Sequence, residues 1–338
     1  MVRYILQRLL LLIPTLLGVL TIVFFMTALS PGDPARIMLG ERANEQQLEQ
    51  LREELGLNRP VGEQYLIYLE HSLRLDFGRS IKTRRPVMEE IQELFPATVE
   101  LALVAMFLAT FLGILVGVLS AVRKNTLLDY TAMVGALAGV SMPVFWLGLV
   151  LIMIFSVGLG WFPTGGRMEV RLFFQPITRF FILDGIILWF REGNPAYLIS
   201  AARHIVLPAI ALATIPLAII ARTTRSSMLE TMRQDYVKTA RAAGIPERRV
   251  IFRYALKNAL LPVITVVGIQ FGLLLAGAIL TETIFAWPGI GRWIYSAISA
   301  RDYPAIQAGL IVVSTVFVFI NMIVDILYSV INPKIRLQ

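Results

Sequence analysis

The sequence QDYVKTARAAGIPERRVIFRYALKNALLPVIT, residues 234–265, is the stretch from which the fold prediction starts. It places a strongly basic helix–Gly–Pro–helix pattern between two segments that are apolar enough to cross a bilayer. Gly244 can take the left-handed conformation that ends a helix, and Pro246 suits the first turn of the next helix. A structured basic element held at one side of a membrane indicates a surface for a partner. We call residues 234–262 the elbow.

The composition is that of a membrane protein. Hydrophobic residues make up 57% of the chain, charged residues 16%, and the mean hydropathy is +0.70. A soluble domain would carry about a quarter charged residues. The net charge of +8 could indicate a nucleic-acid partner, but the basic residues lie between apolar segments, so no nucleic acid is expected. The absence of cysteine excludes a disulfide framework and a thiolate metal site.

Apolar runs of roughly 17–25 residues are long enough to span a bilayer. We expect six of them, at 9–29, 97–122, 131–159, 205–221, 261–281 and 305–331. Pro208 and Pro216 interrupt the fourth, and this helix could begin further upstream, near Pro195. The first run has 21 residues, longer than the roughly 7–15 of a signal peptide, so a retained anchor is predicted.

A seventh span at 172–190 is the alternative. Arg179 and Asp184 would each cost about 2.5–3.5 kcal/mol near its middle, so we expect an outer loop that folds against the bundle or lies at the interface. With six spans and the N-terminus inside, the inner side carries 15 Lys and Arg residues, nine of them between Arg222 and Lys257. The two short outer loops carry five and two. The positive-inside rule then places the elbow and both termini in the cytoplasm.

The chain is predicted to divide into an N-terminal anchor (1–30), a polar periplasmic segment (31–96) and a transmembrane domain (97–331). In the outer segment, the spacing of Leu48, Leu51 and Leu55 and their acidic neighbours in ERANEQQLEQLREELGL suit a surface helix that ends at Gly56. Glycine pairs spaced by four residues predict close approach of helix backbones. These pairs are Gly113/Gly117, Gly135/Gly139 and Gly268/Gly272.

Two helical faces are expected after the corner of the elbow. Arg249, Arg253 and Lys257 share one face, and Ile251, Ala255 and Ala259 share another. Attraction of the basic face to anionic membrane lipid, worth about 1 kcal/mol per residue, is one interpretation. It does not explain the Gly-x-Pro corner or the small residues at 240–243. Docking into a groove of another protein is therefore favoured.

Catalytic patterns are absent from the sequence. There is no GxxxxGK[ST] phosphate loop, so the chain itself is not expected to hydrolyse ATP. His71 and His204 lie in different segments without metal-ligand spacing, so no metal and no cofactor are expected. As intramembrane ionisable residues we expect Glu282, at the outer end of the fifth span, and Asp325, towards the inner end of the sixth, neither of them near mid-membrane. Glu282 could anchor the turn that follows it or line an outer gate.

The elbow resembles the cytoplasmic EAA loop of bacterial ABC-importer permeases, in which Lys238-Thr239-Ala240 stands for Glu-Ala-Ala and Gly244 for the motif's glycine. The long gap from Gly244 to Pro262 is typical of the dipeptide, oligopeptide and nickel subfamily, which commonly has YVRTARAKG here. Further segments agree with that subfamily. They are SPGDP at 30–34, LDFGRSIKTRRPV at 75–87, SMPVFWLGL at 141–149 and LAGAILTETIFAWPGIGRW at 275–293.

The resemblance covers essentially the whole chain and points to dipeptide permeases. It implies an all-α type I importer bundle in a bacterial inner membrane, paired with a homologous second permease, two ATPase subunits that bind ATP and Mg²⁺, and a periplasmic solute-binding protein. The expected ATPase-docking residues are Asp235, Tyr236, Thr239, Ala240, Arg241, Ala243, Gly244 and Pro246. The expected outer-gate or binding-protein contacts are Glu282, Trp287, Pro288 and Gly289.

Alternatives remain at this stage. An ion-coupled secondary transporter would need buried ionisable relays and usually an internal repeat, neither of which is evident. A membrane-bound enzyme or scaffold lacks a catalytic constellation. Within the subfamily, nickel, glutathione or haem-related substrates compete with dipeptides and short peptides.

Overall fold

The computed structural model describes residues 2–29, 34–39, 44–54 and 56–331. Within these ranges the chain is all-α, and its only strand-like pairing is an isolated bridge between Arg79 and Pro86. The long helices are α1 (Val2–Ala28), α5 (Val87–Val122), α9 (Ala196–Thr231), α12 (Leu256–Gly277) and α15 (Tyr303–Ile331). The shorter helices are α2 (Pro34–Leu39), α3 (Glu45–Glu54), α4 (Val61–Leu73), α6 (Leu127–Ser141), α7 (Val144–Leu151), α8 (Phe181–Glu192), α10 (Asp235–Ala242), α11 (Glu247–Arg249), α13 (Ile279–Ile284) and α14 (Ile290–Ser299). Two π-helical segments, η1 (Ile152–Gly158) and η2 (Val250–Ala255), continue α7 and α11.

Helices α5 and α9 form the centre of the bundle, and glycine lets them approach closely. A Cβ atom on Gly113 would lie 2.8 Å from Ile220 Cγ2, and one on Gly117 would lie 2.6 Å from the carbonyl oxygen of Ala221. The apolar core between these helices is made largely of alanine and leucine side chains, and it extends to α12. The predicted close contact at the Gly113/Gly117 pair is therefore confirmed.

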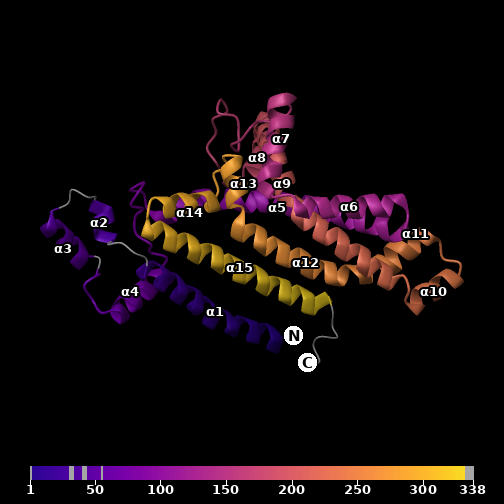
Figure 1. Ribbon diagram of the computed structural model, residues 1–338, viewed down its shortest axis with the longest axis horizontal. Coiled ribbons are helices and arrows are strands. Elements are labelled where there is room, and N and C mark those ends of the chain that lie inside the picture. Colours follow the sequence, from indigo (N-terminus) through magenta and orange to yellow (C-terminus); the bar gives the residue numbers. More distant parts are fainter. Residues whose placement is uncertain (1, 30–33, 40–43, 55, 332–338) are drawn as a thin grey trace.

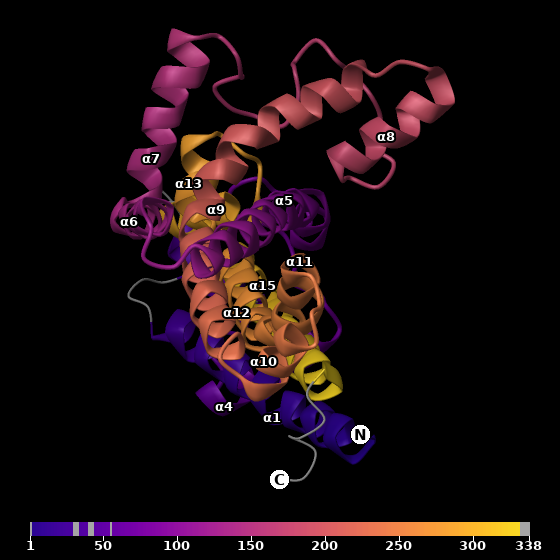
Figure 2. The same ribbon diagram turned by 90° about the vertical axis from the view of Figure 1, so that its right-hand side faces the viewer.

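Helices α12, α15 and α1 lie side by side along the bundle (Figures 1 and 2). Gly268 of α12 meets Val324 of α15, where an added Cβ atom would be only 2.2 Å from the valine side chain. On the other side of α15, Ile311 packs with Leu20 and Val23 of α1. The first helix is thus held against the bundle by α15.

Among the described residues, five helices are long and apolar enough to cross a membrane, and there are six candidate spans when one bent pair of helices is counted as a single span. The span predicted over 131–159 corresponds to this bent pair, so it is broken and not continuous. The chain bends by 103° between helix α6 and the α7–η1 unit, and the break lies at Met142 and Pro143. Proline disfavours helical backbone in the residue before it, and Met142 has an extended conformation with ψ 126°. The α7 helix consequently projects away from the bundle (Figure 1).

The segment 172–190 does not span. Its helix, α8, has 12 residues and is about 18 Å long, which is too short for a bilayer. Asp184 is fully buried and accepts hydrogen bonds from the backbone and the hydroxyl of Thr178 at 2.8 and 2.7 Å. Gly185 brings α8 close to α9, since an added Cβ atom would lie 2.7 Å from Leu198 Cα. The prediction of a loop folded against the bundle is confirmed.

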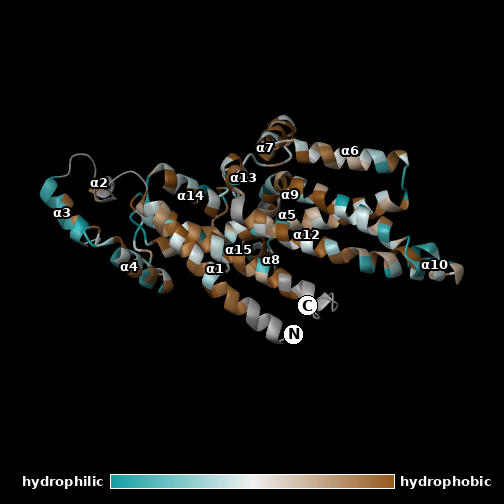
Figure 3. Cartoon of the chain, turned by 60° about the horizontal axis from the view of Figure 1, so that its bottom comes forward, coloured by the Kyte–Doolittle hydropathy of each residue, from teal (hydrophilic) through white to brown (hydrophobic). Residues whose placement is uncertain are grey.

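Hydrophilic residues gather at the two ends of the bundle (Figure 3). At one end, α3 and α4 precede α5; Leu48 of α3 is buried, and Gly56 beyond that helix has φ +68°, as expected. At the other end lies the elbow, with α10 farthest out (Figure 1). The N-terminal end of α1 and the C-terminal end of α15 both point towards the elbow end (Figure 1).

Candidate functional site

The elbow turns through a glycine corner that the backbone itself stabilises. Gly244 has φ +73° and donates its N–H to the carbonyl of Arg241 at 3.0 Å. The N–H of Ile245 reaches back to the carbonyl of Ala240 at 3.2 Å. These two bonds form a Schellman motif, which ends a helix where the residue just beyond it, here Gly244, has a left-handed conformation. Pro246 follows as the N-cap residue of α11, which begins at Glu247.

An ion pair clamps the corner. Arg241, at the end of α10, donates two hydrogen bonds to Glu247 at the start of α11, at 2.7 Å from Nη2 and 3.1 Å from Nε. This hydrogen-bonded carboxylate raises the pKa of Arg241 above its ordinary value. Both side chains are more than a third exposed, so the pair is worth about 1 kcal/mol or less. Its bidentate geometry fixes the angle between the two helices.

A small apolar core holds the elbow together. Val237, Ala240 and Val250 are buried, and Ile245 and Tyr254 pack against them. Ala240 is therefore buried inside the elbow and supports its core, and its predicted docking role stays a prediction. The other predicted docking residues are exposed. They are Asp235, Tyr236, Thr239, Arg241, Ala243, Gly244 and Pro246.

The elbow is also packed onto the ends of the spanning helices. Ile251, Ala255 and Ala259 are buried together with side chains of α5 and α9, among them Val118 and Met228. The two faces predicted from the sequence are confirmed, because Arg249, Arg253 and Lys257 are exposed on the other face. The hydroxyl of Tyr236 accepts a hydrogen bond from the Asn258 side chain at 2.7 Å, which links α10 to α12. Displacement of α10 must therefore act on α5, α9 and α12.

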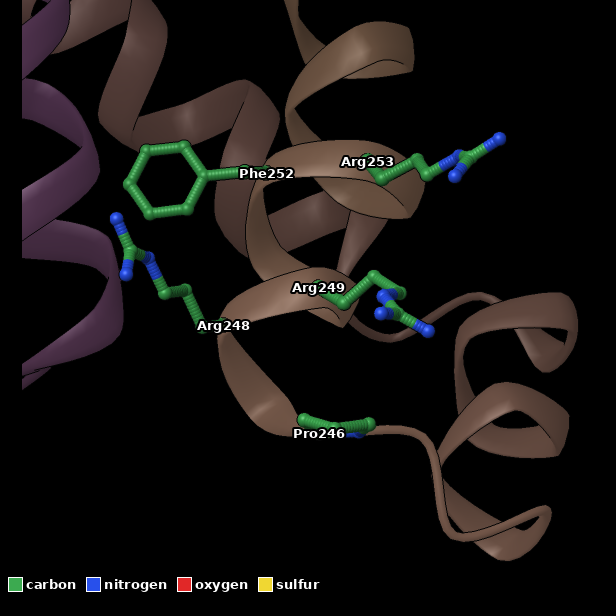
Figure 4. A pocket seen from close by; sticks show the side chains of 5 residues that line it. All are labelled: Pro246, Arg248, Arg249, Phe252 and Arg253. Atoms are coloured by element: carbon green, nitrogen blue, oxygen red, sulfur yellow. The ribbon is translucent and has the colours of Figure 1, made fainter.

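An open hollow of about 480 Å³ lies beside the corner, and Figure 4 shows its side chains. Arg249 and Arg253 extend in the same direction, and Arg248 extends towards a neighbouring helix on the other side (Figure 4). None of the described lining residues carries a carboxylate; they are Pro246, Arg248, Arg249, Phe252 and Arg253. The hollow therefore suits a negatively charged group on a partner. No sequence pattern pointed to Arg248 or Phe252 as part of such a site.

The predicted outer-gate residues lie mostly inside the protein, at the end opposite the elbow. Glu282, Trp287 and Gly289 are buried, and only Pro288 is exposed. The Trp287 indole donates to the carbonyl of Ala97 at 2.9 Å. A Cβ atom on Gly289 would lie 2.2 Å from a carboxylate oxygen of Glu282. These three residues hold the turn together, and their expected contact with a gate or binding protein stays a prediction.

Glu282 is the centre of that turn. One carboxylate oxygen accepts a hydrogen bond from the Thr98 hydroxyl at 2.6 Å, and the other accepts from the backbone N–H of Arg292 at 2.8 Å. Thr98 in turn accepts from the N–H of Ile290 at 2.8 Å. Burial raises the pKa of Glu282, and these donors oppose that rise. The alternative prediction, that Glu282 anchors the following turn, agrees with this geometry.

Two ion pairs, one buried and one partly buried, were not predicted. Arg167, from the segment before α8, lies 2.6 Å from Glu100 of α5, and both side chains are about 5% exposed. Near the elbow end, Arg225 of α9 forms two hydrogen bonds, at 2.6 and 2.7 Å, to Asp129 of α6. Both pairs join segments that are far apart in sequence, and no local spacing signals them. Among the described residues no cluster of His, Asp and Glu could hold a metal ion.

Comparison with known proteins agrees with this architecture. Residues 113–337 match the family model described as "Binding-protein-dependent transport system inner membrane component". Residues 1–102 match that of the N-terminal part of such membrane components.

Curated relatives align along nearly the whole chain. It is 49% identical to the di/tripeptide transport system permease protein DppB of Pseudomonas aeruginosa, with all of both chains covered. It is also 49% identical to the dipeptide transport system permease protein DppB of Escherichia coli K12, with 99% of each chain covered. A glutathione transport system permease protein of Salmonella choleraesuis is 40% identical, again over 99% of each chain. The chain therefore belongs to the family of binding-protein-dependent transport system inner membrane components.

Proposed function

We propose that this chain is one permease subunit of an ATP-driven importer that carries dipeptides or short peptides across the bacterial inner membrane. Family membership supports a transport role that depends on a binding protein. The names of the 49% identical relatives support di- and tripeptides as the substrate class. A relative named for glutathione, at 40% identity, is further away. Glutathione is itself a short peptide, so the same class of substrate fits.

The observation that carries this proposal is the clamped elbow at one end of the bundle. The seven exposed residues that were predicted to dock the ATPases, together with the arginine-lined hollow, form a surface that a partner can bind. Its buried face is packed on α5 and α9 through Ile251, Ala255 and Ala259. We assign this surface to the ATPase subunits. Closure of the ATPases would then move α10 as a lever and tilt the spanning helices between outward-facing and inward-facing states.

The remaining parts follow from that assignment. The elbow and both termini lie in the cytoplasm, consistent with the excess of Lys and Arg in the predicted inner loops. ATP and Mg²⁺ are bound by the partner ATPases, and a homologous second permease completes the path. The segment between α1 and α5 lies in the periplasm with the solute-binding protein.

The functional test is reconstitution of the permease pair, ATPases and binding protein in proteoliposomes, with ATP inside and a labelled dipeptide outside. Uptake that requires ATP and binding protein, and that an ionophore leaves unchanged, is the expected result. Uptake that an ionophore abolishes and ATP does not affect would instead indicate an ion-coupled transporter. Glutathione, haem and chelated nickel are then added as competitors, and their inhibition of labelled dipeptide uptake ranks the possible substrates.

The docking role is tested by placing a tryptophan on the exposed face of the elbow. Ala243→Trp adds bulk where the structure has open surface, so co-purification of the ATPases should be lost. Lys124→Trp is the control, because Lys124 is exposed in the loop between α5 and α6 and lies outside the elbow. Normal ATPase binding by Ala243→Trp, with normal uptake, would show that the elbow is not the docking surface.

A further inference from the structure

The end of the bundle opposite the elbow carries an unexpected group of exposed basic residues. Four of the basic residues that precede α5 fall within residues 79–85, and two more lie at Arg292 and Arg301. Arg85 is paired with Glu93 at 2.7 Å and is set aside. We call the remaining exposed residues the outer basic surface. They are Arg79, Lys82, Arg84, Arg292 and Arg301.

A hollow of about 440 Å³ forms the middle of this surface. Lys82 comes from the loop before α5 and Arg292 from α14, so segments 210 residues apart in sequence meet there. Lys82 Nζ donates to the Ser296 hydroxyl at 2.5 Å. Hydroxyl groups supply the rest of the polar lining, and none of the described lining residues carries a carboxylate. The lining consists of Lys82, Thr283, Arg292, Tyr295, Ser296, Ser299 and Ala300.

The loop that carries Lys82 is held rigidly by a buried aspartate. Asp302, 1% exposed, accepts hydrogen bonds from the Ser80 hydroxyl at 2.5 Å and from the backbone N–H of Lys82 at 3.1 Å. Ser80 also accepts from the N–H of Thr83 at 3.0 Å. The basic loop is therefore positioned before any partner arrives, which lowers the entropic cost of binding.

The two carboxylates that bind the segments around the hollow, those of Asp302 and Glu282, are buried, whereas Lys82 and Arg292 are exposed. Asp302 is bound by Ser80 and by backbone N–H groups, and Glu282 by Thr98 and the N–H of Arg292. Neither carboxylate forms an ion pair with Lys82 or Arg292 among the described contacts. Their charges lie beneath the surface, and the exposed layer of the hollow is positive. The positive-inside rule concerns Lys and Arg in cytoplasmic loops, so it does not account for basic residues at this end of the bundle.

We propose that the outer basic surface is the contact site for an acidic face of the soluble binding protein on which transport depends. This inference rests on the proposed function. Aspartate or glutamate side chains of the partner would enter the hollow, where Arg292 can bind a carboxylate through two N–H groups and Lys82 through its ammonium. Exposed charges of this kind steer encounter and raise the association rate more than they add affinity.

The test is binding of the purified binding protein to the complete importer in nanodiscs, followed over time at low and high salt. Lys82→Glu and Arg292→Glu should each weaken binding about tenfold at low salt, mainly through the association rate, and much less at about 0.5 M salt. Arg74→Glu is the matched control. It makes the same charge change at the C-cap of α4, outside the residues that line the hollow, and should leave binding within about twofold.

Lys82→Gln and Arg292→Gln serve where the reversals fold poorly, and each should weaken binding by a smaller factor in the same direction. Unchanged binding by the charge-reversal variants, or equal weakening by Arg74→Glu, would overturn the proposal. So would a loss that appears only in binding to phosphatidylglycerol vesicles, because the surface would then recognise lipid. ATPase co-purification and basal ATP hydrolysis are measured in the same preparations. If the unmodified importer neither retains the ATPases nor hydrolyses ATP, the proposed function is wrong. If it does both, but the charge-reversal variants bind the binding protein as the parent does, this inference alone is wrong.

Discussion

Gly244 offers the sharpest test of how the elbow works. Its φ of +73° is a left-handed conformation, and a Cβ atom built there meets no atom within 4 Å. A substitution therefore changes only the backbone preference and introduces no clash. Asparagine tolerates this conformation, alanine costs about 1 kcal/mol, and β-branched valine costs about 2 kcal/mol. The three substitutions form a graded series of corner stability.

The assay is titration of the permease pair in nanodiscs with its ATPases, and the quantity measured is the dissociation constant. If the ATPases bind only the present geometry of the corner, the free energy that a substitution adds to this geometry is lost from the binding free energy. Gly244→Asn should therefore bind within about twofold of the parent, Gly244→Ala about fivefold more weakly and Gly244→Val about thirtyfold more weakly.

Gly193 supplies a matched control for this series. It ends α8 with φ +68°, and its Cβ position is equally open, but it lies outside the elbow. Gly193→Val should leave ATPase affinity unchanged. The reasoning fails if Gly244→Val binds as the parent does, if Gly244→Asn is as weak as Gly244→Val, or if Gly193→Val weakens binding equally.

Three further outcomes are expected. Arg241→Glu should open the corner by repelling Glu247 and lower ATPase affinity, and the swap Arg241→Glu/Glu247→Arg should restore most of it; no recovery would mean that the charge of Arg241 itself contacts the partner. Glu100→Ala should leave the buried Arg167 without its carboxylate partner and lower the free energy of unfolding by about 3–5 kcal/mol. The double change Glu100→Leu/Arg167→Met should lower it much less. Thermal unfolding in detergent compares the two variants, and equal losses would contradict the account. Thr98→Val should destabilise the protein by about 1–3 kcal/mol in the same assay, because the Glu282 carboxylate and the Ile290 N–H both lose a partner; an unchanged unfolding temperature would refute this.

The elbow was predictable because its signals are local. Gly244 and Pro246 define a corner within a few residues, and a period of four residues separates the face of Arg249 and Arg253 from that of Ile251. Close packing at Gly113 was predictable for the same reason, since a small residue on a spanning helix has few other uses. Features of this kind need no knowledge of where distant segments fold.

The outer end could not be predicted in this way. Glu282 and Trp287 have residue types that suit an exposed interface, and their burial depends on Thr98 and Ala97, more than 180 residues earlier in the chain. The bend at Pro143 was missed because the apolar run continues on both sides of it. The hydropathy of a segment gives no information on the direction of its helix axis. A pair such as Arg167 and Glu100 is evident only when the fold brings its members together.

Single-cysteine labelling tests the central placement most directly, because the chain contains no cysteine of its own. Lys238 is exposed on α10, so Lys238→Cys presents one thiol at the elbow. A membrane-impermeant maleimide should label it in inside-out vesicles and not in right-side-out vesicles, and added ATPase subunits should protect it. Labelling from the external side, or labelling in inside-out vesicles that bound ATPases leave unchanged, would contradict the assignment of the elbow as the cytoplasmic ATPase-docking surface.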